Sequence, residues 1–306
     1  MKKIVSISLG SSERDNKIKR ELLGEEFEIE RIGTDGDMDK AIRLFEELDG
    51  EVDAFGLGGI DLYLYAGKKR YMIRDAKKIV DNVKKTPIVD GSGLKNTLER
   101  EVIRKIDKSI ELGGRRVLIV SALDRFGMAE TLDNLGADLV LGDLIFGLGV
   151  PIPISSLKVL KRISQAVMPL VSKLPFKLLY PTGSKQLAHQ DKYSKYYDWA
   201  QVIAGDFHYI RRYLPDNLRG KIIITNTVTQ NDLELLRKKG VTKVITTTPE
   251  FEGRSFGTNV MEAILVTLID KKVEDIHISD YLNILRNIDL EPRIEEFESD
   301  EVKEEY

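Results

Sequence analysis

The chain has 306 residues, and its 47 Lys and Arg nearly balance its 50 Asp and Glu. It therefore lacks the basic excess that drives binding to phosphate backbones, and we expect no nucleic-acid partner. The absence of Cys excludes disulfides, thiolate metal sites and cysteine nucleophiles, and the three scattered His residues argue against any metal site.

The N-terminus and the apolar stretches indicate a location. Polar serines interrupt the first twelve residues, MKKIVSISLGSS, unlike a signal peptide. The longest apolar stretch, Leu139 to Ile154, contains Asp143, glycines and prolines, which makes it unsuited to span a bilayer. We therefore expect a cytoplasmic protein with no membrane partner.

The first half alternates short β-branched runs with stretches of helical periodicity, which is typical of parallel α/β units. The expected strands are Ile4–Ser8, Phe27–Ile32, Ala54–Leu57 and Pro87–Val89. The expected helices are Met38–Leu48, Ile73–Lys84 and Gly93–Glu111, the last with a charged face that includes Lys95.

The second half repeats this pattern more regularly. Its expected strands are Val117–Ser121, Leu139–Gly142, Phe176–Tyr180, Val202–Ala204, Ile222–Thr225 and Val244–Thr247. A full dinucleotide-binding sheet has the same number of strands, six, with helices between them. The fold class is therefore α/β: an N-terminal α/β substrate-type domain over residues 1–112, followed by a doubly wound Rossmann-like parallel sheet over residues 113–290.

Two further segments stand apart from this pattern. The long apolar segment that follows the second strand of the sheet, up to Pro175, favours a buried helix that covers one sheet face or forms a homodimer contact. A helix on a membrane surface is the alternative. Residues 291–306 are acidic with few apolar groups, which predicts a disordered tail.

The segment from Val117 to Asp143 is a candidate cofactor site, because a strand runs into a turn and then a helix. Backbone N–H groups at such a turn can bind a pyrophosphate, and an acid after the next strand can hold a ribose. A βαβ unit that binds no dinucleotide is an equal alternative, since the usual glycines are missing and Asp124 would repel a phosphate. The expected cofactor-binding residues are Ser121, Leu123, Phe126, Gly127 and Asp143.

Asp90 is a candidate catalytic residue, because it ends an expected strand and precedes a Gly-Ser-Gly helix start. A carboxylate at the carboxyl end of a parallel strand lies where open α/β sheets bind ligands, so it could act in acid/base chemistry or hold a hydroxyl. Asp90 could equally well only cap the following helix.

The stretch VDGSGLKNTLE, followed by GRRVLIVSALDRFGMAETLDNLGADLV, resembles the domain junction of the shikimate/quinate dehydrogenase family. The resemblance implies that Asp90 is the aspartate of a catalytic dyad, with Lys68 or Lys69 as the closest lysines for the second position. It also implies substrate contacts in SISLGSSERD, at Ser8, Ser11 and Ser12. Departures are Ile88, where the family has Asn, and the degraded glycine fingerprint.

Other clusters also suit ligand contact. His208 follows an expected strand, although a lone His is more often structural. Arg254 lies in a segment rich in Thr and Gly. The glycines of FGLGG, Gly56 to Gly59, could bind an anion or only form a turn.

Two functions follow from these observations. The first is an NAD-dependent oxidoreductase that transfers hydride between nicotinamide and a hydroxylated cyclic carboxylate such as quinate or shikimate. Asp143 would favour NAD over NADP, because a carboxylate repels a 2′-phosphate. The alternative is a non-redox α/β protein that binds an anionic or phosphorylated metabolite in an interdomain cleft, with Gly-rich loops at Gly56–Gly59 and Gly253–Gly257. In both cases the partner is a small molecule.

Overall fold

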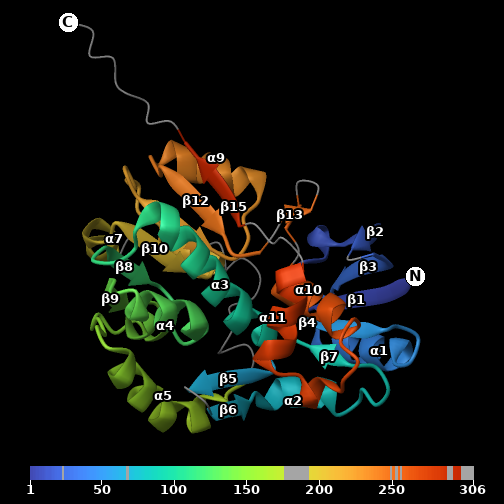
Figure 1. The fold of residues 1–306 in the computed structure, drawn as a ribbon. Coiled ribbons are helices and arrows are strands. Elements are labelled where there is room, and N and C mark those ends of the chain that lie inside the picture. Colours follow the sequence, from blue (N-terminus) through green and yellow to red (C-terminus); the bar gives the residue numbers. More distant parts are fainter. Residues whose placement is uncertain are drawn as a thin grey trace, which may run out of the picture. The chain divides into compact units, whose positions relative to one another are not determined.

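The computed structural model describes residues 1–22, 24–66, 69–175, 193–248, 250–251, 254–255, 257–287 and 292–297. The chain forms two compact units. The first unit comprises Met1–Glu99, Leu160–Ala188 and Phe256–Leu290. The second comprises Arg100–Val159, His189–Ser255 and Glu291–Tyr306. Each unit has its own sheet, which confirms the α/β class and the doubly wound Rossmann-like sheet (Figure 1).

The sheet of the first unit has the strand order β2-β3-β1-β4-β7. Its parallel strands are β1 (Lys2–Ser8), β3 (Glu25–Gly33), β4 (Ala54–Gly58) and β7 (Ile88–Val89). They coincide with the four expected strands. Parallel strands that are buried on both faces consist of nearly continuous runs of β-branched and aromatic residues, and such runs can be recognised in the sequence. An antiparallel hairpin, β5 (Tyr63–Ala66) and β6 (Lys69–Met72), lies apart from this sheet.

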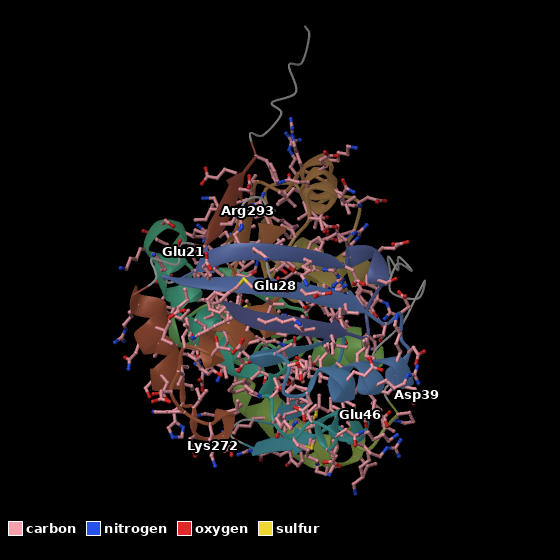
Figure 2. All side chains as sticks on the ribbon, turned by 90° about the vertical axis from the view of Figure 1, so that its right-hand side faces the viewer. Glu21, Glu28, Asp39, Glu46, Lys272 and Arg293 are labelled. Atoms are coloured by element: carbon pink, nitrogen blue, oxygen red, sulfur yellow. The ribbon has the colours of Figure 1, made fainter. Side chains whose placement is uncertain are left out.

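Strand β2 (Asn16–Leu22) was not expected from the sequence. It pairs antiparallel with β3, and its alternate residues are half-buried or exposed. Lys17 Nζ lies 2.8 Å from Glu28 Oε1 and 3.0 Å from Glu30 Oε2 on β3. Figure 2 shows Glu28 on this sheet, with Asp39 and Glu46 on helix α1. A charged edge strand lacks the apolar run that identifies buried strands, and its charges also discourage pairing with another chain.

Helices of both units follow the expected periodicity. They are α1 (Met38–Leu48), α2 (Arg74–Val80), α3 (Ser92–Ile110), α4 (Phe126–Asn134), α5 (Leu157–Val171), α7 (Ser194–Trp199), α8 (Phe207–Arg212), α9 (Gln230–Lys238), α10 (Thr258–Val266) and α11 (Ile278–Asn287). Short helical turns are η1 (Ser12–Arg14), η2 (Asp143–Gly147) and η5 (Val273–Asp275).

Helix α10 packs closely on the first sheet over a track of small residues. A Cβ added at Gly56 would lie 3.1 Å from both Nδ2 and the carbonyl oxygen of Asn259. A Cβ at Gly91, whose φ is +90°, would lie 2.7 Å from Asn259 N. Asn259 Nδ2 donates a hydrogen bond to Ser6 Oγ at 2.9 Å. Gly56 and Gly91 therefore allow the close packing of α10, and the anion site considered at Gly56–Gly59 stays a prediction.

The sheet of the second unit has the order β15-β12-β11-β10-β8-β9. Its parallel strands are β8 (Arg116–Ile119), β9 (Asp138–Leu141), β10 (Val202–Gly205), β11 (Ile222–Thr225) and β12 (Lys243–Thr246). The expectation that Leu139–Gly142 lies parallel beside Val117–Ser121 is confirmed. The expected strand Phe176–Tyr180 lies outside the described residues. A two-stranded ribbon, β13 (Glu250–Phe251) and β14 (Arg254–Ser255), is separate from this sheet.

The two units are not contiguous in sequence, unlike the expected domains 1–112 and 113–290. Phe256–Leu290 belongs to the first unit, because α10 packs on β1 and β4. In the segment expected to be a disordered tail, β15 (Arg293–Glu296) forms the antiparallel edge of the second sheet. Apolar periodicity reveals a helix but not which distant sheet it covers, and an acidic strand resembles a tail in composition.

We predict that β15 is needed for full stability. A chain ending at Leu290 loses the pairing of β15 with Lys243–Thr246 and the Lys243–Glu296 ion pair of 2.7 Å. At about 1 kcal/mol for each net hydrogen bond, losing two costs about 2 kcal/mol, or roughly 4 to 8 °C in Tm. A chain ending at Phe297 is the control and should melt like the full chain. Equal Tm values for the two truncations would contradict this role of β15.

Candidate functional site

The second sheet has a topological switch point between β8 and β10. From β8 the chain first forms β9 on one side, and the next described strand, β10, pairs with β8 on the other side. Ligands of open α/β sheets bind at the carboxyl ends of the strands at such a point. Ser121 follows β8 and Asp206 follows β10, so both lie at this edge.

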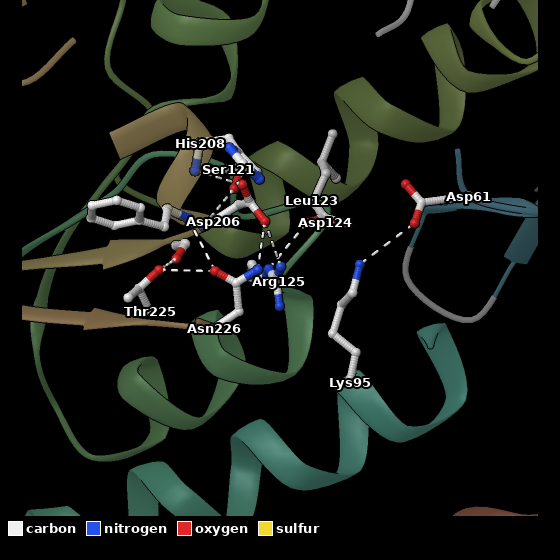
Figure 3. A network of polar contacts seen from close by, with 12 residues as sticks. Asp61, Lys95, Ser121, Leu123, Asp124, Arg125, Asp206, His208, Thr225 and Asn226 are labelled. Carbon is white, nitrogen blue, oxygen red and sulfur yellow. Dashed lines mark hydrogen bonds and ion pairs between the residues drawn. The ribbon is translucent and has the colours of Figure 1, made fainter. Parts of the chain in front are cut away.

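Asp206 is the centre of a polar network at the switch point, which Figure 3 shows. Its Oδ1 accepts a hydrogen bond from His208 N at 2.9 Å and so caps α8. Its Oδ2 accepts bonds from Arg125 Nη2 at 2.8 Å and from Asn226 Nδ2 at 2.9 Å. Asn226 Oδ1 in turn accepts a bond from Phe207 N at 3.1 Å. The network thus fixes the loops after β8, β10 and β11 to one another.

Arg125 is the buried cation of this network. Its side chain is only 2% exposed, and its Nε lies 3.1 Å from Asp124 Oδ2. Two carboxylates therefore flank one guanidinium, and Asp143 adds a third acid at the same turn. A buried charge persists only when paired and hydrogen-bonded, so Arg125 holds its neighbours in a fixed geometry.

Asp143 occupies the position that a pyrophosphate would need. Its carboxylate accepts hydrogen bonds from Leu123 N at 2.9 Å and from Ala122 N at 3.2 Å. Burial raises the pKa of Asp143 to about 6, although these two N–H groups act in the opposite direction. The N–H groups of the turn are therefore already bonded, and Asp124 adds negative charge. These residues do not fit a dinucleotide pyrophosphate, and NAD binding stays a prediction that the turn does not support.

The other expected cofactor residues lie in or next to α4 and are largely buried. Phe126 begins α4, Gly127 is buried within that helix, and Ser121 is buried at the switch point. Ser121 Oγ lies 3.5 Å from Asp206 N, a hydrogen bond at the limit of length. The structure thus brings Ser121, Leu123 and Asp143 together, and His208 lies at the same edge through its backbone bond to Asp206.

The expected substrate serines take part in local turns of the first unit. Ser8 Oγ accepts a bond from Gly10 N at 3.1 Å, and Ser11 Oγ accepts one from Glu13 N at 3.2 Å. Ser12 N donates to Asp35 Oδ1 at 2.8 Å. These contacts explain the serines without a ligand, so their role in binding stays a prediction.

Two other groups of expected site residues are only partly described. Lys68 lies outside the described residues, and Lys69 begins β6 with its side chain undescribed. Arg254 begins β14, again without a described side chain. The lysine partner that the resemblance implied for Asp90 is therefore not among the contacts described.

Asp90 is nearly buried, with both oxygens bonded to the backbone. Oδ1 accepts a bond from Ser92 N at 2.9 Å, and Oδ2 accepts one from Leu62 N at 2.6 Å. The bond from Ser92 N fits the alternative that Asp90 caps α3, and the bond from Leu62 N additionally fixes the chain at Leu62. A catalytic role for Asp90 stays a prediction.

A group of buried ionisable residues lies near Asp90 and was not predicted from the sequence. Lys95 is only 8% exposed, although it was expected on a charged helix face, and its Nζ lies 3.6 Å from Asp61 Oδ1 (Figure 3). Glu262 of α10 is 4% exposed, and its Oε1 accepts a bond from Tyr281 OH at 2.7 Å. A single Glu in the apolar run VMEAILV was the available signal, because such a helix is buried on most sides.

The surroundings of Glu262 favour its neutral form. Its Oε2 is buried without a hydrogen-bond partner among the described residues. Burial first, and the nearby Asp90 carboxylate second, raise the pKa of Glu262 from 4.5 to about 8. The neutral acid therefore belongs to the native packing of α10 on the first sheet.

We predict that Glu262→Gln becomes increasingly favourable as the pH rises. Because the folded pKa is raised, Glu262 contributes full stability below about pH 4.5 and loses it as the pH rises through about 8. Gln does not titrate. The free energy of unfolding of the variant, relative to that of the wild type, should therefore rise by about 1.4 kcal/mol per pH unit in that window and reach a few kcal/mol. Denaturant unfolding at pH 5, 7 and 8.5 measures this difference.

Glu274→Gln, at an exposed position of η5, is the matched control and should show little pH dependence relative to the wild type. A difference for Glu262→Gln that stays constant from pH 5 to 8.5 would show that Glu262 does not titrate in this range.

Comparison with solved structures finds mostly sugar-binding proteins. A glucose-galactose binding protein from Geobacillus stearothermophilus has 10% identity and a TM-score of 0.41, covering 96% of this chain and 97% of its own. The periplasmic binding protein of an arabinose transporter from Shewanella sp. ANA-3 has 8% identity and a TM-score of 0.38, covering 93% and 95%. A periplasmic ribose transporter protein from Conexibacter woesei DSM 14684 has 10% identity and a TM-score of 0.38, covering 93% and 94%. At these scores none assigns a ligand to this chain.

These findings correct several expectations. The resemblance to the shikimate/quinate dehydrogenase family is wrong, since the family models that match belong to other families and most of the similar structures are sugar-binding proteins. The predicted function that followed from this resemblance, an NAD-linked oxidoreductase acting on quinate or shikimate, is also wrong. The expected cytoplasmic location is corrected as well, because several of the similar proteins are described as periplasmic.

Family comparison gives the remaining result. No curated protein matches the chain. Residues 3–90 match the model described as Domain of unknown function (DUF8753). Residues 93–297 match the model described as Domain of unknown function (DUF8754). Because the second model covers more than half of the 306 residues, the chain belongs to the DUF8754 family.

Proposed function

We propose that this protein binds a small hydroxylated molecule, without redox chemistry, at the switch point of the second sheet. The observation that carries the proposal is the Asp206 network, in which a buried guanidinium and an amide fix one carboxylate at the ligand edge of the sheet. A site whose polar groups are already held in place loses little conformational entropy when a ligand binds.

The residues at this edge suit hydroxyl groups better than phosphates. Asp124 and Asp206 flank the guanidinium of Arg125, and Asp143 lies at the same turn, so these four groups together carry a negative charge at neutral pH that opposes an anionic ligand. Carboxylate oxygens accept hydrogen bonds, whereas a guanidinium donates them. A hydroxyl group can donate to the first and accept from the second. An uncharged polyhydroxylated molecule, such as a free sugar or polyol, fits this balance.

Two side chains are the proposed direct contacts. Among the described residues, the hydroxyl of Ser121 accepts one long hydrogen bond, from Asp206 N. His208 is exposed on the first turn of α8, where its backbone N–H is bonded to Asp206. Asp206 accepts hydrogen bonds from Arg125, Asn226 and His208 N and acts by positioning its neighbours.

A ligand panel tests the proposal. Thermal shift and calorimetry would compare neutral sugars and polyols, their phosphate esters and NADH. A ligand at 100 times its Kd adds about 2.7 kcal/mol of stability and raises Tm by several degrees. We expect this only for uncharged hydroxylated compounds. A response confined to phosphate esters would favour the anionic alternative, and a response confined to NADH would refute a non-redox binding site.

Substitutions locate the binding site. Ser121→Ala and His208→Ala should each weaken binding of a neutral ligand by roughly 3- to 10-fold, the usual net worth of one hydrogen bond, and leave Tm unchanged. The matched controls Ser109→Ala on α3 and His277→Ala before α11 remove the same groups from exposed positions elsewhere. Unchanged affinity in both site variants, or an equal loss in the controls, would place the ligand away from this edge.

A further inference from the structure

The segment from Leu144 to Gln190 has an unusual charge distribution. It contains six Lys and Arg and no Asp or Glu, although the whole chain carries 50 acidic residues. Since the net charge of the whole chain is −3, the rest of the chain carries −9 against +6 in this segment. A basic segment on an acidic protein indicates a place where an anionic partner is attracted.

The same segment holds most of the exposed large apolar side chains among the described residues. They are Leu148, Val150, Ile152, Val159, Val167, Leu170 and Leu174, and Leu170 is the most exposed at 74%. Three others, Met1, Ile278 and Ile294, lie elsewhere in the chain. Scattered exposed apolar residues need no explanation, but a concentration of this kind marks an interaction surface.

Helix α5 (Leu157–Val171) has two apolar faces. Leu157, Leu160 and Ser164 are buried and attach the helix to the protein. Val159, Ala166 and Leu170, spaced by seven and four residues, lie on another, exposed face. The helix is therefore not covered on all sides, whereas the sequence predicted a buried helix in this segment.

Basic side chains lie on α5 and directly after it, with Lys158 and Arg162 beside the exposed face. Lys158, Arg162 and Lys173 are exposed, and Lys161 is half-buried. Within the part of the chain that the structure describes, none of these four forms an ion pair with an acidic residue. Their charge is therefore directed to solvent or to a partner.

We propose that the exposed face of α5 docks on an anionic lipid surface. An apolar stripe bordered by Lys and Arg is the composition of helices that lie in the plane of a membrane interface. Each basic residue near an anionic bilayer contributes attraction that adds to apolar burial. A symmetric dimer through the same face would bring these cations against one another, which argues against a second copy. None of the described helices is long and apolar enough to cross a membrane, so the contact is peripheral.

Vesicle binding tests this surface. The full chain would be sedimented with phosphatidylcholine vesicles that contain or lack phosphatidylglycerol, at low and high salt. We expect binding to the anionic vesicles at low salt, with at least tenfold less on neutral ones or at high salt. Absence of binding to anionic vesicles at low salt would overturn the proposal.

Paired variants tie the binding to α5. Leu170→Asn should lower the partition coefficient roughly tenfold, and Lys158→Gln with Arg162→Gln roughly 10- to 30-fold. The controls are Ile278→Asn, an exposed apolar residue 47% exposed on α11, and Lys272→Gln, which is labelled in Figure 2. Both should bind like the wild type. Equal binding by all variants, or a concentration-dependent dimer that Leu170→Asn abolishes, would overturn the proposal.

Discussion

The pairing of Arg125 with Asp206 is the constraint on which the second unit's ligand edge depends. A guanidinium that is 2% exposed must be paired, and removing the partner of such a charge costs about 3 to 5 kcal/mol. Because Asp206 also caps α8 and receives the amide of Asn226, three successive loops take their positions from one ion pair. The arrangement gives a rigid edge at the switch point, and rigidity of this kind favours recognition of one ligand shape over many.

The sequence predicted the sheet strands well where they are buried. The five described parallel strands of the second sheet are short apolar runs, and no competing pattern disguises them. Strands β2 and β15 were missed because their residues are charged and their pairing depends on neighbours distant in sequence. Likewise Lys95 resembles any surface lysine of a helix, and only the burial of its helix face reveals it. Propensity is local, whereas burial is decided by the whole fold.

The failed resemblance has a physical explanation. A strand, a tight turn and a helix start recur wherever a parallel sheet is built, so their order carries fold information but little chemical information. The residues that would have carried chemistry were degraded in the sequence, and the structure shows that the turn replaces an external anion with Asp143, an acid of the chain itself. The N–H groups of this turn therefore bind an internal carboxylate in place of an external anion.

The discontinuity of the first unit has a consequence for biosynthesis. Strands β1 and β4 are synthesised well before α10, which covers their glycines and follows β4 by about two hundred residues. Until then the nascent sheet presents an uncovered surface, and its closure joins residues some two hundred positions apart. Contacts of such long range slow folding and prolong the lifetime of exposed, aggregation-prone intermediates. Completion of the first unit is thus delayed until Thr258–Val266 has left the ribosome.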